Sequence, residues 1–191
     1  MRQDRVVLLT DNYELNEDII SILQKYELSR IESGPVGQDG LRLIRRQVPD
    51  LIILDASKKI TSSLELSKVL AEDEAAAIVL ILSELSSKLR ETANESGVFN
   101  FILKPVSEIN LIPAVESSLM NFERLKKLRE EKEYLEKTLE RRKLVEKAKG
   151  VIMKKYDLPE DEAYRKLQKQ AMNRCISLKD LAEAVILANE V

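Results

Sequence analysis

Three uninterrupted apolar runs constrain the fold of this chain more than any other feature of its sequence. They occupy residues 6–9, 51–54 and 78–82. Runs of this length are typical of strands that are buried on both faces, as in parallel sheets. Helical spacing of apolar residues follows the first run, at Leu15, Ile19 and Leu23, and recurs before Pro49. This alternation predicts a parallel α/β domain, with a weaker strand near residues 30–32.

Polar residues directly follow each of these runs. Asp11 comes after the first run, Asp55 after the second and Ser83 after the third. A fourth apolar segment, residues 101–103, ends at Lys104. Because the functional groups of open parallel sheets gather at the carboxyl ends of the strands, we expect these four side chains around one pocket.

The composition excludes several kinds of chemistry. The chain has no histidine, so histidine-based triads and zinc sites are excluded, and a phosphohistidine that donates a phosphoryl group must belong to another protein. Its single cysteine, Cys175, cannot form an internal disulfide, and we expect a buried, inert thiol. No signal-peptide pattern occurs, and no apolar run approaches the roughly 20 residues that span a bilayer. We therefore expect a soluble, cytoplasmic protein without a membrane partner.

Charge divides the chain into two parts. Residues 1–120 hold 13 Lys or Arg against 19 Asp or Glu, whereas residues 121–191 hold 18 against 14. The overall charge of -2 therefore combines an acidic first part with a basic second part. This asymmetry predicts two domains with different partners, and a polyanion is a candidate partner of the second.

A long helix is predicted between these parts. From residue 107 to 154 no glycine occurs before Gly150 and no proline after Pro113, so one continuous helix is the simplest interpretation. Part of it fits the a and d positions of a short coiled coil, which predicts a homodimer. These positions hold Leu125, Leu128, Lys132, Leu135, Leu139 and Arg142. The alternative is a single charged helix packed on the first domain.

Two further helices are expected in the tail. Pro159 suits the first position of one helix, which would bury Ala163 and Leu167. Ser177 and Asp180 form a capping-box pattern at the start of the other. Together with the end of the long helix, they predict a small all-α domain of three helices.

The residues at the strand ends suit phosphoryl transfer to an aspartate. A carboxylate accepts a phosphoryl group when a divalent cation and an ammonium offset the negative charge of the transferred oxygens. Asp55 is the candidate nucleophile, Asp11 and Asp55 are candidate metal ligands, and Lys104 is the candidate ammonium. The Ser83 hydroxyl is a candidate to bind the phosphoryl group and shift its loop. Taken singly, these residues also suit structural roles, as a helix cap, a turn hydroxyl or a surface charge.

Residues 4–120 resemble the receiver domains of response regulators. The resemblance rests on Asp11 at the end of the first strand, the stretch 49–55, the hydroxyl of Ser83, and Leu103-Lys104-Pro105 after the aromatic Phe101. It implies a flavodoxin-like, five-stranded parallel sheet and bound Mg²⁺. It also implies phosphorylation of Asp55 by a histidine kinase as phosphodonor, and a switch role for Phe101.

Three positions depart from the pattern of that family. Thr10 stands where a second acidic residue is usual, Glu84 stands where a small residue is usual, and Lys59 stands where proline is typical. The missing carboxylate weakens the predicted metal site, and the Glu84 carboxylate would repel a phosphoryl group. One alternative function is therefore a degenerate receiver that is controlled by protein–protein sequestration.

A basic strip and a glycine mark the end of the long helix. Lys143, Lys147, Gly150 and Lys154 share one helix face. Residues 139–174 hold 11 Lys or Arg against 6 Asp or Glu, which indicates nucleic-acid binding or a solvated face. Because glycine inside a helix is destabilising by about 1 kcal/mol relative to alanine, Gly150 indicates close approach of a packed helix or a nucleic-acid phosphate.

Residues 138–191 resemble the ANTAR domain. The resemblance rests on the stretch 142–153 with its Ala148-Lys149-Gly150 core, and on residues 160–164 and 178–182. It implies dimers that grip paired stem-loops of a leader RNA and prevent a terminator hairpin from forming. The candidate RNA-binding residues are Lys143, Lys147, Lys149, Gly150, Lys154, Arg165, Lys166, Lys169 and Arg174. Tyr164 suits either base stacking or the helical core, and we expect the core.

These features predict a receiver domain at residues 1–120, a coiled-coil linker helix at 121–142 and an RNA-binding ANTAR domain at 138–191. The predicted function is transcription antitermination regulated by phosphorylation of Asp55. No enzymatic activity is expected apart from self-phosphorylation and dephosphorylation at that aspartate. A DNA-binding response regulator is the second alternative, although residues 156–159 do not obviously form the tight turn that precedes a recognition helix.

Overall fold

The computed structural model describes residues 4–58, 60–72, 76–84 and 97–189. The chain divides into two compact units, Met1–Lys126 and Lys127–Val191. The first unit combines a sheet with helices, and the second is helical. Among the described residues, no helix has the length and apolar character needed to cross a membrane.

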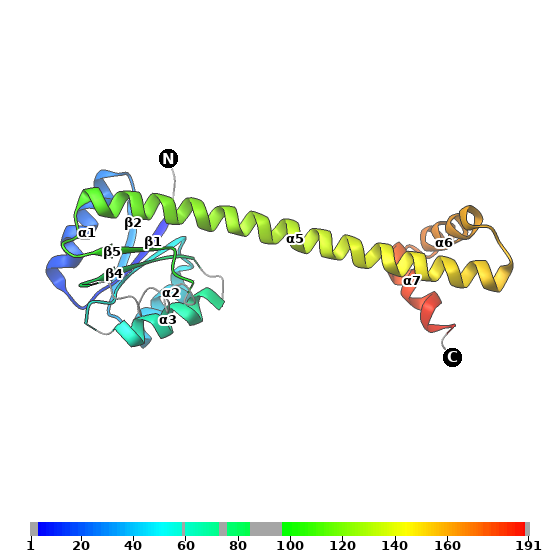
Figure 1. The fold of residues 1–191 in the computed structure, drawn as a ribbon, viewed down its shortest axis with the longest axis horizontal. Coiled ribbons are helices and arrows are strands. Elements are labelled where there is room, and N and C mark those ends of the chain that lie inside the picture. The colour runs from blue at the N-terminus through cyan, green and yellow to red at the C-terminus, as the bar shows by residue number, and fades with distance from the viewer. Residues whose placement is uncertain (1–3, 59, 73–75, 85–96, 190–191) are drawn as a thin grey trace. The chain divides into compact units, whose positions relative to one another are not determined.

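The first unit is built on a five-stranded parallel sheet in the order β2-β1-β3-β4-β5 (Figure 1). The strands are β1 (Arg5–Leu9), β2 (Arg30–Gly34), β3 (Leu51–Asp55), β4 (Ala77–Leu82) and β5 (Asn100–Leu103). The helices are α1 (Tyr13–Lys25), α2 (Gln38–Gln47), α3 (Ile60–Glu72) and the start of α5 (Glu108–Tyr156). This strand order is that of the flavodoxin-like fold, so the predicted fold class is confirmed.

Alternate residues of the central strands enter two separate hydrophobic cores. On one face of the sheet, Leu8 and Ile53 pack with α1 and α5, and on the other face Leu9 and Leu54 pack with α2 and α3. Figure 1 shows these two pairs of helices on opposite sides of the sheet. Every residue of β3 and β4 is buried, and each large apolar side chain contributes about 1.5–3 kcal/mol. This two-sided burial explains the uninterrupted apolar runs.

The second unit is a three-helix domain, as predicted. It consists of the end of α5, α6 (Glu160–Arg174) and α7 (Leu178–Leu187). Its core holds Val145, Ala148, Ile152, Ala163, Leu167, Ala171, Leu181, Ala182 and Ile186. The Ser177 hydroxyl caps α7 by accepting a hydrogen bond from the backbone N–H of Asp180 at 3.1 Å, whereas Pro159 immediately precedes α6 rather than beginning it.

Two predictions about burial in the second unit are wrong. Cys175 is exposed, because it stands at the C-terminus of α6, where the backbone turns into the left-handed region with φ of 54°. Tyr164 is 41% exposed, because α6 buries a narrow stripe of Ala163, Leu167 and Ala171 and the tyrosine lies outside it.

Candidate functional site

The carboxyl ends of three strands bring Thr10, Asp55 and Lys104 together in the first unit. The Asp55 side chain is 5% exposed, and the Thr10 hydroxyl donates a hydrogen bond to its Oδ2 atom at 2.9 Å. Lys104 Nζ lies 3.4 Å from each of the two carboxylate oxygens. The nucleophile and the ammonium proposed from the sequence are therefore neighbours.

Ser57 takes part in three further hydrogen bonds of this cluster. Its backbone N–H donates to Asp55 Oδ1 at 3.1 Å, and its hydroxyl donates to the same oxygen. Lys104 Nζ donates to the Ser57 hydroxyl oxygen at 2.8 Å. Sequence reasoning assigned no role to Ser57. A usable signal was its spacing, since aspartate side chains commonly accept a hydrogen bond from the N–H two residues further on.

These contacts hold the Asp55 carboxyl in its charged form. Burial acts to raise its pKa, but the hydrogen bonds from Ser57 and Thr10 and the charge of Lys104 outweigh burial and leave the pKa below its ordinary value. The deprotonated carboxylate is the form that attacks phosphorus. The cluster thus holds an anionic, largely enclosed carboxylate at neutral pH.

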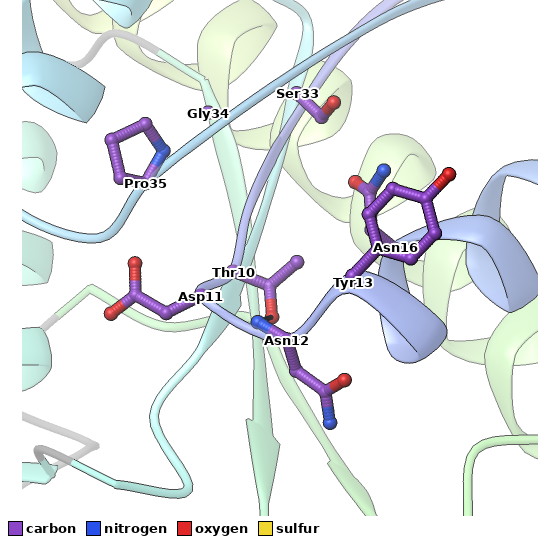
Figure 2. A pocket seen from close by; sticks show the side chains of 8 residues that line it. All are labelled: Thr10, Asp11, Asn12, Tyr13, Asn16, Ser33, Gly34 and Pro35. Carbon is purple, nitrogen blue, oxygen red and sulfur yellow. Dashed lines mark hydrogen bonds between the residues drawn. The ribbon is translucent and has the colours of Figure 1, made fainter.

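Asp11 follows β1 and has an exposed side chain. Its Oδ1 atom accepts a hydrogen bond from the backbone N–H of Val36 at 3.1 Å. Figure 2 shows the Asp11 carboxylate turned away from Tyr13 and Asn16. The hollow drawn there, of about 350 Å³, is lined by Thr10, Asp11, Asn12, Tyr13, Asn16, Ser33, Gly34 and Pro35. A cavity of about 10 Å³ is lined by Asp11, Asn12, Val36, Asp55 and Lys58.

The residues around the small cavity do not fit a tightly bound Mg²⁺. Mg²⁺ prefers an octahedral shell of oxygen ligands that includes carboxylates. Both Asp55 oxygens already accept hydrogen bonds, and Thr10 offers a neutral hydroxyl in place of a carboxylate. Lys58 also lines this cavity, and its side chain is exposed. Within the described parts of the chain, no group of three or more His, Cys, Asp or Glu side chains is arranged to hold a metal ion.

The other residues singled out in the first unit are Ser83, Glu84, Phe101 and Lys59. Ser83 and Glu84 directly follow β4 and are exposed. In the sheet, Asp55 of β3 lies opposite Ile81 of β4. Ser83 is therefore two residues further along the chain than the residue opposite Asp55. Phe101 is partly buried in β5 against the core formed with α2 and α3. Lys59 lies outside the described residues.

The basic residues of the second unit occupy different settings. Those with exposed side chains are Lys143, Lys147, Lys154, Arg165, Lys169 and Arg174. Lys166 Nζ lies 3.5 Å from the centroid of the Tyr156 ring, a cation–π contact between α6 and α5.

At Gly150, an added Cβ would meet nothing within 4 Å. The packed helix that Gly150 suggested is therefore not found in the described chain, and the position is open to an external partner.

Lys149 is buried in an ion-pair cluster. Its side chain is 9% exposed, and Nζ lies 2.5 Å from a carboxylate oxygen of Glu146 and 2.6 Å from one of Glu160. Hydrogen bonds from the ammonium to these two glutamates raise the pKa of Lys149. The pair with Glu160 joins α5 to α6. Because two carboxylates already neutralise this ammonium, it is a poor ligand for phosphate, and we remove Lys149 from the candidate RNA-binding residues.

We expect Lys149→Met to lower the thermal denaturation midpoint of the protein slightly, because it removes the ion pair that joins α5 to α6, while the exposed carboxylates of Glu146 and Glu160 remain hydrated. Circular dichroism measures this change. The matched control is Lys154→Met, an exposed lysine on the same helix, which should leave the midpoint unchanged. An unchanged midpoint for Lys149→Met, combined with weaker nucleic-acid binding, would return Lys149 to the RNA-binding set.

The fold and the aspartate–lysine cluster at the strand ends are those of a response-regulator receiver. A model of the response regulator receiver domain matches residues 6–116, and a model of the ANTAR domain matches residues 133–186. The transcriptional regulatory protein PdtaR of Mycobacterium tuberculosis (strain ATCC 25618 / H37Rv) is 30% identical over 182 residues, which cover 95% of this chain and 89% of PdtaR. The chain therefore belongs to the response regulators that carry a C-terminal ANTAR domain, a family of non-enzymatic antitermination regulators.

Solved structures support the fold of the first unit. Chemotaxis protein CheY4 of Vibrio cholerae superimposes with a TM-score of 0.55 at 17% identity, over 60% of this chain and 98% of CheY4. A DNA-binding response regulator of the LuxR family from Staphylococcus aureus gives a TM-score of 0.54 at 16% identity, over 61% of this chain and 98% of that protein. At these identities the likeness concerns the fold alone.

Proposed function

We propose that this protein is a transcription antiterminator that binds stem-loops of a structured leader RNA and is regulated by phosphorylation of Asp55. One chain combines an ANTAR domain, matched at residues 133–186, with a receiver whose Asp55 is anionic and lies beside Lys104. This combination is the observation that carries the proposal. PdtaR, a transcriptional regulatory protein, is similar to this chain over 89% of its own length. The proposed site of action is the cytoplasm.

The proposed RNA-binding surface comprises basic residues of α5 and α6, most of them exposed. Lys143, Lys147 and Lys154 share one face of α5 around Gly150. Exposed lysine and arginine side chains bind phosphates and release condensed counterions. The open space at Gly150 supports close approach of a phosphate to the helix backbone. Arg165, Lys166, Lys169 and Arg174 are the further candidates from α6.

The proposed phosphodonor is the phosphohistidine of a histidine kinase, because this chain has no histidine of its own. An Asp55 carboxylate oxygen attacks the phosphorus, the phosphorus–nitrogen bond breaks, and the imidazole leaves with the bonding electron pair. Lys104 is placed to offset the charge on the transferred oxygens. Self-phosphorylation from small donors and later hydrolysis at Asp55 are the proposed limit of the protein's own catalysis.

The proposed homodimer forms through the middle of α5. The four leucines of the predicted coiled-coil stripe remain exposed: Leu125 by 41%, Leu128 by 54%, Leu135 by 53% and Leu139 by 56%. Pairing with the same stripe of a second copy would remove them from water, as in a coiled coil. Lys132 of this stripe forms an ion pair with Glu136 on the same helix, whereas the pair of Lys137 and Glu133 lies outside the stripe.

We expect the double variant Leu128→Glu and Leu135→Glu to be monomeric at concentrations where the wild type is dimeric, because it places charges at two central d positions. Sedimentation velocity measures the change. Glu130→Lys with Glu131→Lys, which changes exposed charges on the same helix, is the control and should remain dimeric. A wild type that sediments as a monomer even when phosphorylated would contradict the coiled-coil assignment.

Cross-linking in living cells tests the proposed function. Nucleic acid that copurifies with the protein after ultraviolet irradiation should be RNA, enriched in leaders with two stem-loops upstream of a terminator. Recovery of promoter DNA would favour the DNA-binding alternative. Recovery of a protein partner without nucleic acid would favour sequestration.

A further inference from the structure

One exposed face of α6 carries a ridge of three side chains that suit contact with RNA bases. Tyr164, Gln168 and Met172 lie four residues apart, so they follow one another along the same side of the helix. All three are exposed, Tyr164 by 41% and Met172 by 72%. Resting on the proposed binding of a leader RNA, we infer that this ridge reads unpaired loop bases. The Tyr164 ring stacks on one base, and the Gln168 amide hydrogen-bonds the edge of a base.

The first observation behind this inference is that Tyr164 has no polar partner within the described chain. A tyrosine that serves the core usually finds a hydrogen bond for its hydroxyl. Helix α6 instead packs through Ala163, Leu167 and Ala171, and the tyrosine lies outside that stripe. More than half of its surface is nevertheless covered, so the ring loses less side-chain entropy when a ligand binds. Unpaired RNA bases stack on aromatic rings of this kind.

The second observation concerns Gln168, which is one helical turn beyond Tyr164. Four residues of α-helix rise by about 6 Å, so the two side chains are neighbours on the surface. The Gln168 amide is exposed and, among the described residues, has no side chain as a hydrogen-bond partner. An amide offers both donors and an acceptor, which match the donor and acceptor groups on base edges. The two side chains can therefore contact the same loop.

The third observation is that two cations lie beside this ridge. Arg165 and Lys169 directly follow Tyr164 and Gln168 in the sequence, and both are exposed. Within the described ranges neither forms an ion pair. Lys149 and Lys179, by contrast, are held by glutamates of the same unit. Arg165 and Lys169 thus remain available to bind the phosphates of the nucleotides whose bases meet the ridge.

These charges favour RNA over a protein as the occupant of this face. The centre of a protein interface is depleted in charged residues. Stacking side chains beside free cations are instead characteristic of surfaces that bind single-stranded nucleic acid. Asp161 and Glu162 place negative charge in the first turn of α6, where it complements the helix dipole. The loop is therefore expected on the C-terminal side of Tyr164, away from these carboxylates.

Replacement of Tyr164 tests the stacking contact in the full chain. Tyr164→Ala should bind the recovered leader RNA at least about tenfold more weakly in fluorescence anisotropy. Its dependence on salt should equal that of the wild type, because a neutral ring releases no counterions. Tyr164→Phe keeps the ring and should bind within about twofold of the wild type. The control Tyr134→Ala removes a tyrosine that is 70% exposed on α5 and should have no effect.

Replacement of Gln168 tests the edge contact. The wild type should prefer the leader over an RNA with the same stems and altered loop sequences. Gln168→Ala should reduce this preference at least about fivefold, because the loop base loses its hydrogen-bond partner. Asn173→Ala removes another exposed amide of α6, outside the ridge, and should keep the preference. An unchanged preference in Gln168→Ala would overturn the role of that residue.

Photo-cross-linking of the wild type tests the same contact without a substitution. With 4-thiouridine in the loops of the leader, mass spectrometry should locate the attached nucleotide on Tyr164 or its neighbours in α6. Attachment to α5 alone would overturn the role of α6 in reading the loop. Circular dichroism verifies that each variant is folded.

The outcomes separate the reading of bases by α6 from RNA binding as such. A wild type that binds the leader while Tyr164→Ala binds it equally well overturns the role of Tyr164 and leaves the proposed function standing. Equal losses in Tyr164→Ala and Tyr164→Phe, or a flatter salt dependence in Tyr164→Ala, overturn stacking. If Tyr164→Ala keeps RNA binding but loses a copurifying protein, the ridge is a protein-docking surface. A wild type that does not bind the leader overturns both.

Discussion

Asp55→Asn is expected to take up no phosphoryl group from acetyl phosphate under conditions in which the wild type gains one per chain. The asparagine amide is not a nucleophile, because its oxygen lacks the negative charge of the carboxylate. Its carbonyl oxygen can still accept hydrogen bonds from Thr10 or Ser57, so the variant should fold. Intact mass spectrometry with Mg²⁺ present measures the modification, and circular dichroism verifies the fold.

Glu65→Gln is a control for the removal of a carboxylate, because Glu65 is exposed on α3. It should be labelled as the wild type is. If Asp55→Asn is labelled as well, the acceptor is another residue. If the wild type is never labelled while an ordinary receiver is labelled in parallel, the chain is a degenerate receiver, and control by protein–protein sequestration becomes the better proposal.

Reversing three charges on α5 should abolish most RNA binding. The triple variant Lys143→Glu, Lys147→Glu and Lys154→Glu is expected to bind the recovered leader RNA at least about 100-fold more weakly at 0.1 M salt. Each lost phosphate contact should also flatten the dependence of log K on log salt by about 0.7–1 unit. Fluorescence anisotropy over a range of salt concentrations measures both quantities.

A matched control separates local contacts from net charge. Arg30, Arg42 and Arg45 are exposed cations of the receiver, and reversing all three gives the same change in net charge. This control should keep nearly the full affinity and salt dependence. Equal losses in the two variants would mean that α5 makes no specific contacts. If the wild type binds the leader and a scrambled RNA equally well, the basic strip is only a solvated face of the helix.

The sequence predicted most of the fold, because burial on both faces leaves a strong pattern. The runs at 51–54 and 78–82 are apolar throughout, since alternate residues enter two different cores. Helix α7 was placed by the pattern of Ser177 and Asp180, in which local hydrogen bonds determine where a helix starts. Helix α3 was not predicted, because its first turns hold Thr61, Ser62 and Ser63, which favour helices weakly.

The part of the site that lies at the ends of the strands could be predicted from the sequence. Parallel strands end at one edge of the sheet, so Asp55 and Lys104 could be placed together from their positions in the sequence. Ser57 and Lys58 lie in the loop after β3, whose path is not set by a periodic pattern. Lys149 was included among the candidate RNA-binding residues because the sequence of its own helix does not reveal Glu160. That glutamate approaches Lys149 from another helix.

Transcription through the recovered leader tests the proposed function most directly. In a single-round assay with purified polymerase, phosphorylated wild-type protein should increase the fraction of transcripts that extend past the terminator. The Asp55→Asn variant and the triple α5 variant should each leave that fraction near its value without protein. Unchanged readthrough with the phosphorylated wild type, or a change in initiation at the promoter alone, would contradict antitermination by this protein.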